Sequence, residues 1–330
     1  MADAHIQRRK SKRLDAPRTY EDVPVIHRPH WKWLVIWYFF IGGISAASGM
    51  IGAIASLSGK ARHRDLARHA YWVSLLTIIA CPILLILDLG KPSRFFNMLR
   101  VIKLRSPMSV GSWALTMFGA LVGLAVLKDP TLGETDEPPS SKAIVSRLPA
   151  RTIHVAILPL GAMVAAYTGA LIGATAVPVW AKAPRLLTAL FVSSAFTTGT
   201  SAIAMSRVAT GHGRTPSPAL GGLKQLSMLV ELVLLFGWLR ALGRSGRPLR
   251  TGTVGTVVDQ GVIGVGLAAP MVIAAVAGYR PGRGAQALRL VGLAASLAGG
   301  FALRYAVVIA GRDSADDPQA TFEFTKAPED

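Results

Sequence analysis

The chain of 330 residues is 51% hydrophobic and only 16% charged, and its mean hydropathy is +0.42. Its polar residues lie between apolar runs of about 20 residues, the length at which a helix crosses ~30 Å of hydrocarbon. This pattern indicates an α-helical membrane protein with several spans rather than a soluble domain. The net charge of +18 does not indicate a nucleic-acid partner, because the cations are scattered over many loops, where they meet membrane lipid headgroups.

The order of apolar runs predicts an all-α fold with eight transmembrane helices, preceded by a polar basic arm (1–32) and followed by an acidic tail (312–330). The basic patch of the arm is not followed directly by an apolar run, so we expect no signal peptide. An even number of spans places both termini on one side of the membrane. The predicted spans are Trp33–Leu57, Ala70–Leu89, Met108–Leu127, Ile153–Thr175, Leu186–Met205, Leu220–Leu239, Gly255–Ala277 and Gln286–Ala310.

The distribution of Lys and Arg favours termini on the cytoplasmic side of the cell membrane. The arm, the tail and the loops on their side carry 21 of these residues, and the opposite loops carry 14. Cytoplasmic loops are enriched in Lys and Arg, which gives the direction of the prediction.

The connection between the second and third spans, from Leu87 to Trp113, is the most distinctive loop. Gly90 is expected to end the second span, and Pro107 is expected to begin the third, where its missing N–H costs little. A basic loop of this kind at a membrane face is a candidate docking surface for a soluble partner. Its five cations are Lys91, Arg94, Arg100, Lys103 and Arg105.

The cysteine and histidine pattern bears on bound cofactors. Cys81 is the single cysteine, so neither an internal disulfide nor a cysteine cluster site can form within the protein. The predicted spans have no histidine in their interior, where paired histidines would bind haem. We therefore expect this protein to bind neither haem nor an iron–sulfur cluster.

Ionisable and polar residues at membrane depth are costly, so each is a functional candidate. Glu231 lies midway along the sixth span, and Arg304 in the eighth is its candidate counter-charge. Asp88 closes the second span and Asp259 opens the seventh, where either carboxylate could equally be interfacial. Tyr167 lies inside the fourth span, where its hydroxyl needs a partner, either a ligand or a neighbouring helix.

Four sequence motifs, in this order, resemble the NrfD/PsrC family, the integral membrane subunits of polysulfide-, nitrite- and formate-type respiratory complexes. They are FFIGGISAASG in the first span, LDLGKPSRFFNML followed by SPMSVGSW, YTGALIGATAVPVW from Tyr167, and GGFALRYAVVIAG from Gly299. The resemblance extends from Trp33 to Gly311.

The resemblance implies two four-helix bundles, 33–175 and 176–311, with an exchangeable menaquinone or ubiquinone bound in the first bundle near the face that carries the termini. It also implies two kinds of partner. A four-cluster ferredoxin-like iron–sulfur subunit would dock on that face and exchange electrons with the quinone, and a molybdopterin or multihaem catalytic subunit would complete the complex.

Residue by residue, the resemblance assigns quinone contact to Tyr167, which would hydrogen-bond a quinone carbonyl, and to Asp88 beside it. Polysulfide reductase supplies Asn and His from its first span, whereas this sequence has Trp37 and Tyr38 near that depth, which offer aromatic stacking and a phenol. Trp113, at the end of SPMSVGSW, belongs to the same predicted pocket.

Glu231 and Arg304 match charged positions proposed to relay protons through the second bundle, and Asp259 is the third predicted member of this relay. The protein alone is expected to be non-catalytic, because the substrate chemistry belongs to a missing subunit.

The sequence is also compatible with two alternatives. A secondary transporter could use Glu231 and Arg304 as a midplane site beside the proline-interrupted seventh span. Transporters built from repeats would show broken helices in matching places, and Pro82, Pro159 and Pro270 do not match in spacing. A purely structural anchor without a quinone site is the second alternative.

Overall fold

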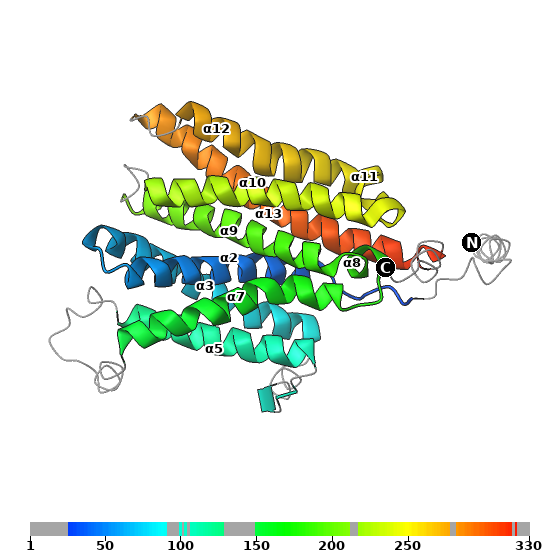
Figure 1. Ribbon diagram of the computed structural model, residues 1–330, viewed down its shortest axis with the longest axis horizontal. Coiled ribbons are helices and arrows are strands. Elements are labelled where there is room, and N and C mark those ends of the chain that lie inside the picture. Colours follow the sequence, from blue (N-terminus) through cyan, green and yellow to red (C-terminus); the bar gives the residue numbers. More distant parts are fainter. Residues whose placement is uncertain are drawn as a thin grey trace, which may run out of the picture.

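The computed structural model describes residues 26–90, 99–100, 102–103, 106–128, 149–211, 217–277, 282–318 and 321, and the regular elements among them are helices. Eight helices in this part of the protein are long and apolar enough to cross a membrane, as the sequence predicted. Consecutive spans run in opposite directions along one axis, so the start of the first span and the end of the last span lie at the same end of the molecule (Figure 1). We call this the terminal end, and the other the distal end.

The helices, in order along the sequence, are α2 Trp33–Leu57, η2 Ala61–His63, α3 Arg64–Leu89, α5 Pro107–Leu127, α7 Ala150–Gly173, α8 Pro178–Ala181, α9 Pro184–Ala209, α10 Pro218–Leu242, η4 Gly243–Leu249, α11 Gly252–Thr256, η5 Val257–Ala268, α12 Ala269–Ala277 and α13 Arg283–Ala315. The seventh span is formed by α11, the π-helix η5 and α12 together.

The two helix boundaries predicted from Gly90 and Pro107 are confirmed. Gly90 caps α3 in the left-handed conformation (φ 67°) and donates its N–H to the Ile86 carbonyl oxygen at 3.2 Å. Pro107 is the first residue of α5, and the Ser106 side chain accepts a hydrogen bond from the Ser109 N–H. Both boundaries follow from local backbone chemistry.

Several helices extend beyond the predicted spans. At the distal end α3 begins at Arg64 and α13 at Arg283, and at the terminal end α10 continues to Leu242 and α13 to Ala315. Hydropathy placed these ends in loops because they carry charged side chains. A helix tolerates such residues beyond the hydrocarbon, because long basic side chains extend toward water or headgroups.

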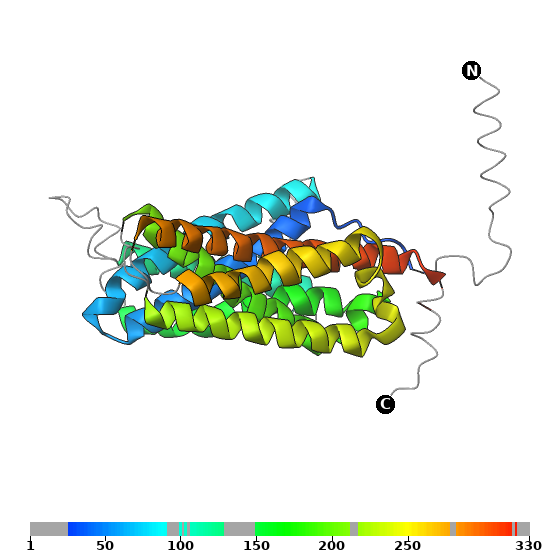
Figure 2. The ribbon, with the colours of Figure 1, turned by 90° about the horizontal axis from the view of Figure 1, so that it is seen from above.

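The α2 and α9 helices lie in the middle of the molecule. The α2 helix packs against α3, α7 and α9, and α9 packs against α7, α10 and α13, while η5 and α12 cover α13. Figures 1 and 2 show these helices side by side along one common axis. Since α7 packs both on α2 and on α9, the division into two four-helix bundles stays a prediction.

Glycines set the closest helix contacts. A Cβ atom added at Gly299 of α13 would overlap the Cα atom of Gly266 in η5. A Cβ atom at Gly300 would overlap Cγ2 of Thr198 in α9. Small residues let membrane helices approach until their backbones touch, and this packing replaces the hydrophobic driving force that lipid does not provide.

Trp180 of α8 joins the N-terminal arm to the last helix. Its indole is fully buried and donates Nε1–H to the Val307 carbonyl oxygen at 2.8 Å. It stacks on Trp31, with ring centroids 5.2 Å apart. Arg28 lies 3.4 Å from a carboxylate oxygen of Asp313 in α13, and this half-exposed pair adds little stability by itself.

We predict that Gly299→Ala destabilises the protein, because the new methyl group must separate η5 from α13. Overpacking of this kind costs about 1–3 kcal/mol. Gly237→Ala in α10 is the matched control, since no atom of the described residues lies within 4 Å of its added Cβ. The midpoints of thermal unfolding in detergent measure the difference. Equal midpoints for the two variants would contradict the described contact.

Candidate functional site

Four helices each contribute one residue to a buried layer near the terminal end. Tyr38 lies in α2, Cys81 in α3, Gly111 in α5 and Tyr167 in α7. Each is within about 12 Å of its helix end on that side, counted along the axis. Residues far apart in sequence therefore lie at one depth, which is the first requirement for a common site.

Tyr38 and Tyr167 are the central pair of this layer. Tyr38 is only 4% exposed and lies close enough to Tyr167 and Cys81 to interact with both electrostatically. The ring of Tyr167 lies directly over Gly111, where an added Cβ would overlap the ring. Among the described residues, neither tyrosine hydroxyl has a hydrogen-bond partner, so both are available to a ligand.

The other predicted quinone contacts differ in placement. Trp113 is half-buried, and its Nε1 atom is buried with no hydrogen-bond partner among the described side chains and backbone. Trp37 packs on Phe301 of α13 with ring centroids 4.6 Å apart and is 41% exposed. Adjacent helical residues point about 100° apart, which is why Trp37 faces α13 while Tyr38 faces inward.

Two of the five predicted docking cations are described. Arg100 and Lys103 are exposed at the terminal end, and the Lys103 backbone N–H donates to the Ser109 hydroxyl at 3.0 Å. Lys91, Arg94 and Arg105 lie outside the described residues.

Asp88 is exposed near the end of α3 and interacts electrostatically with Lys32, which precedes α2. It therefore lies at the rim of the terminal end, outside the buried layer of tyrosines. A carboxylate in this position can exchange protons with water.

A second polar group lies in the core of α9, α10 and α13. Arg304 is 1% exposed and donates to the Ser194 hydroxyl and to the carbonyl oxygens of Phe191, at 3.1 Å, and Gly300, at 3.2 Å. Its guanidinium carbon also lies 5.0 Å from the centroid of the Phe191 ring. These contacts satisfy most of the guanidinium.

Glu231 of α10 joins this group through hydroxyls. It is 2% exposed, and its carboxyl lies close enough to the side chains of Ser194, Thr197 and Arg304 to interact with them electrostatically. No direct ion pair links these two described charges, so Ser194 bridges them. One carboxyl oxygen of Glu231 and Nε of Arg304 are buried without a hydrogen-bond partner in the described part of the protein. The third predicted relay residue, Asp259, is exposed on η5.

Sequence reasoning missed the contribution of α9. Most of its hydroxyls donate to carbonyl oxygens of their own helix, as Ser201 does to Thr197 at 2.8 Å. Ser194 is different because it connects two charged side chains. The density of hydroxyls within one span is the signal that could have identified the helix. The buried hydroxyl residues of α9 are Ser193, Ser194, Thr197, Thr198, Thr200 and Ser201.

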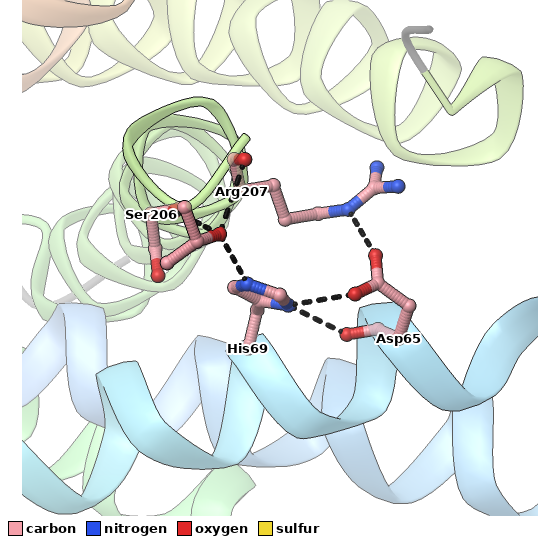
Figure 3. Close-up of polar contacts among 5 residues, drawn as sticks. Asp65, His69, Ser206 and Arg207 are labelled. Atoms are coloured by element: carbon pink, nitrogen blue, oxygen red, sulfur yellow. Dashed lines mark hydrogen bonds and ion pairs between the residues drawn. The ribbon is translucent and has the colours of Figure 1, made fainter. Parts of the chain in front are cut away.

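A polar cluster at the distal end ties α3 to α9 (Figure 3). Arg207 donates Nε–H to the Asp65 carboxylate at 2.9 Å. His69 Nδ1 lies 2.8 Å from the Asp65 carbonyl oxygen, and Nε2 lies 2.8 Å from the Thr210 hydroxyl. His69 is therefore held between two helices near a membrane face rather than in the middle of a span.

Among the described residues, no group of three or more His, Cys, Asp or Glu side chains is placed to hold a metal ion. That haem and iron–sulfur clusters belong to other subunits stays a prediction.

The eight spans and their buried polar groups define a multi-pass α-helical membrane protein. The sequence matches the family described as "Polysulphide reductase, NrfD" over residues 21–313, and the protein belongs to that family. It is 28% identical to the C subunit of the polysulfide reductase of Wolinella succinogenes over 303 residues, which cover 86% of this protein and 94% of that subunit. The protein is thus a membrane subunit of a respiratory oxidoreductase.

We predict that Arg304→Gln destabilises the protein by about 3 kcal/mol, because it removes one partner of a buried charged network. Glu231→Gln combined with Arg304→Gln should cost less than the sum of the two single changes, with a coupling of about 0.5–3 kcal/mol. Thermal unfolding of the three variants measures this coupling. Strictly additive losses would show that Ser194 does not link the two side chains.

Proposed function

We propose that this protein binds an exchangeable membrane quinone at its terminal end and positions it for electron exchange with an iron–sulfur subunit. The observation that carries the proposal is the pair formed by Tyr38 and Tyr167. The two phenols lie close together and at one depth, and neither has a hydrogen-bond partner among the described residues. The family relationship supports the same class of function.

The donors in this layer suit a quinone. The two carbonyl oxygens of a quinone accept hydrogen bonds. A phenol O–H or an indole N–H can donate to them only if it does not already donate to another group in the protein. One face of the Tyr167 ring packs directly on Gly111, and this contact fixes the orientation of the ring. Trp113 adds a buried Nε1–H without a partner among the described residues.

A quinone supplies the two-electron, two-proton chemistry of the complex, and the protein supplies binding and proton access. Tyr167 and Tyr38 orient the headgroup by hydrogen bonds to its oxygens. Asp88 at the rim holds or releases a proton toward water. Trp37, on the α13 side, offers a lipid-facing aromatic surface rather than a hydrogen bond.

The network of Glu231, Ser194 and Arg304 is proposed as a proton relay through the second half of the molecule. One carboxyl oxygen of Glu231 has no hydrogen-bond partner among the described residues, and the Ser194 hydroxyl lies between this carboxyl and the Arg304 guanidinium. A proton can therefore reach or leave the carboxyl with small side-chain movements. Asp259 on the exposed side of η5 would act only at the surface end of such a path.

The proposed partner is a four-cluster ferredoxin-like iron–sulfur subunit, docked on the terminal end of the molecule. Arg100 and Lys103 are exposed there, next to the helix ends that carry the tyrosine layer. A molybdopterin or multihaem catalytic subunit would complete the complex. We also propose location in the cell membrane with cytoplasmic termini, from the distribution of Lys and Arg.

We predict that Tyr167→Phe lowers quinol-linked turnover of the purified complex about fivefold, because one hydrogen bond to the quinone, worth about 1 kcal/mol, is lost. Asp88→Asn should lower turnover with a change in its pH profile, because a proton-exchanging group at the rim is removed. Unchanged turnover in both variants would exclude the proposed site.

Gly111→Ala tests the same site without touching a hydrogen-bonding group. The added methyl group must displace the Tyr167 ring, so we expect a similar loss of turnover. Gly119→Ala in the same helix is the matched control, since its Cβ would meet Ile78 at 3.4 Å, an ordinary contact. Equal activity of the two glycine variants would argue against the described Tyr167 position.

We predict that Arg100→Glu with Lys103→Glu weakens association with the iron–sulfur subunit, because charge reversal at a docking surface costs affinity and slows association. Arg283→Glu, at the distal end, is the control. Copurification at rising salt concentration measures the effect. Equal retention of the iron–sulfur subunit by the two variants would show that the docking surface does not include Arg100 and Lys103.

A further inference from the structure

A pocket at the distal end is lined by residues of four helices. It has a volume of about 150 Å³ and includes Arg207 of α9, Lys224 and Gln225 of α10, and Gln286 and Arg289 of α13, with α12 completing the wall. Its described lining contains no acidic residue. It lies in the half of the molecule and at the membrane face that the proposed quinone site does not use.

The cations of this pocket are largely uncompensated. Arg289 has Nη1 buried with no hydrogen-bond partner among the residues that the structure describes. Half-buried Lys224 makes no hydrogen bond or ion pair with another described residue. Only Arg207 is balanced, through its 2.9 Å contact with Asp65. A buried or half-buried cation without a partner has a desolvation cost that no protein group offsets. An anionic ligand bound beside these cations would offset that cost.

The depth of these cations matches lipid headgroups. Lys224 is the seventh residue of α10 and Arg289 the seventh of α13, which places each about 9 Å from its helix start. The 33 residues of α13 extend about 50 Å, whereas the hydrocarbon is ~30 Å thick, which leaves about 10 Å at each end for headgroups. Both cations therefore lie near the boundary between headgroups and hydrocarbon.

The wall of the pocket is apolar and opens between helices. Leu220 and Met228 of α10 face Pro270 and Ile273 of α12 across it. The α10 helix packs on α9, and α12 packs on α13, but α10 and α12 are not among the closely packed pairs. A molecule in the membrane can thus enter from the side.

We propose that this pocket binds the headgroup of an anionic phospholipid. Lys224 and Arg289 bind its phosphate, and the side chains of Leu220 and Ile273 contact the upper part of an acyl chain. The cavity has the volume of about five water molecules, so it admits the phosphate and glycerol while the acyl chains extend through the opening between α10 and α12. Basic pockets between transmembrane helices recognise anionic headgroups in this way.

The test uses the full-length protein in neutral detergent, together with any subunits that copurify. Phosphatidylglycerol, phosphatidylcholine and inorganic phosphate are each titrated, and binding is followed by native mass spectrometry and by the midpoint of thermal unfolding. We expect phosphatidylglycerol to bind and to raise the midpoint. Phosphatidylcholine and inorganic phosphate should do neither at the same concentration.

Lys224→Gln and Arg289→Gln should each weaken phosphatidylglycerol binding about fivefold, the effect of about 1 kcal/mol per cation. Arg283→Gln is the matched control, because Arg283 is exposed on the same helix end and does not line the pocket; its binding should change less than about twofold. The comparison of lipids on the unaltered protein stands even if a variant fails to fold. Equal binding of the two lipids, full replacement by inorganic phosphate, a neutral quinone retained in place of lipid, or unchanged binding in both variants would each overturn the proposal.

Discussion

A guanidinium buried among helices is the constraint on which the polar core depends. Arg304 needs acceptors at fixed positions because an unsatisfied charge in a membrane protein is costly. Phe191 and Ser194 supply them from α9, and Ser194 passes the connection to Glu231 in α10. The α2 helix closes the fourth side, since a Cβ at Gly43 would lie 3.4 Å from Arg304 Nη2. One side chain thereby fixes the relative register of four spans.

The sequence motifs that this protein shares with its family are determined by helix packing as much as by the chemistry of a site. A Cβ at Gly169 would lie 2.7 Å from the Cα atom of Thr188, and one at Gly311 would overlap the Trp180 ring. Such positions tolerate only glycine because another helix or an indole occupies the space. Shared motifs of this kind therefore establish the fold strongly. They establish a ligand site only where a side chain with unsatisfied hydrogen-bonding capacity, such as Tyr167, is part of the motif.

The sequence predicted the number of spans and the boundaries at Gly90 and Pro107, because these depend on apolar length and local backbone chemistry. It could not orient Trp37 and Tyr38, since the first span is apolar on all sides and gives no periodic signal. It also placed the charged first turn of α13 in a loop, because hydropathy falls where long cations begin. The role of Ser194 depends on contacts between helices, which no local pattern contains.

The central position of α2 has a consequence for how the protein is made. This is the first of the eight spans to leave the ribosome and the most buried of them, yet it packs against α9 and α13, which are synthesised much later. Its small-residue face, with Gly43 toward Ala195 and Arg304 and with Ala47 toward Gly199, must wait in lipid or in the insertion machinery until those helices arrive. Synthesis that stopped before α13 would leave this face uncovered, in a form that membrane quality-control proteases could recognise.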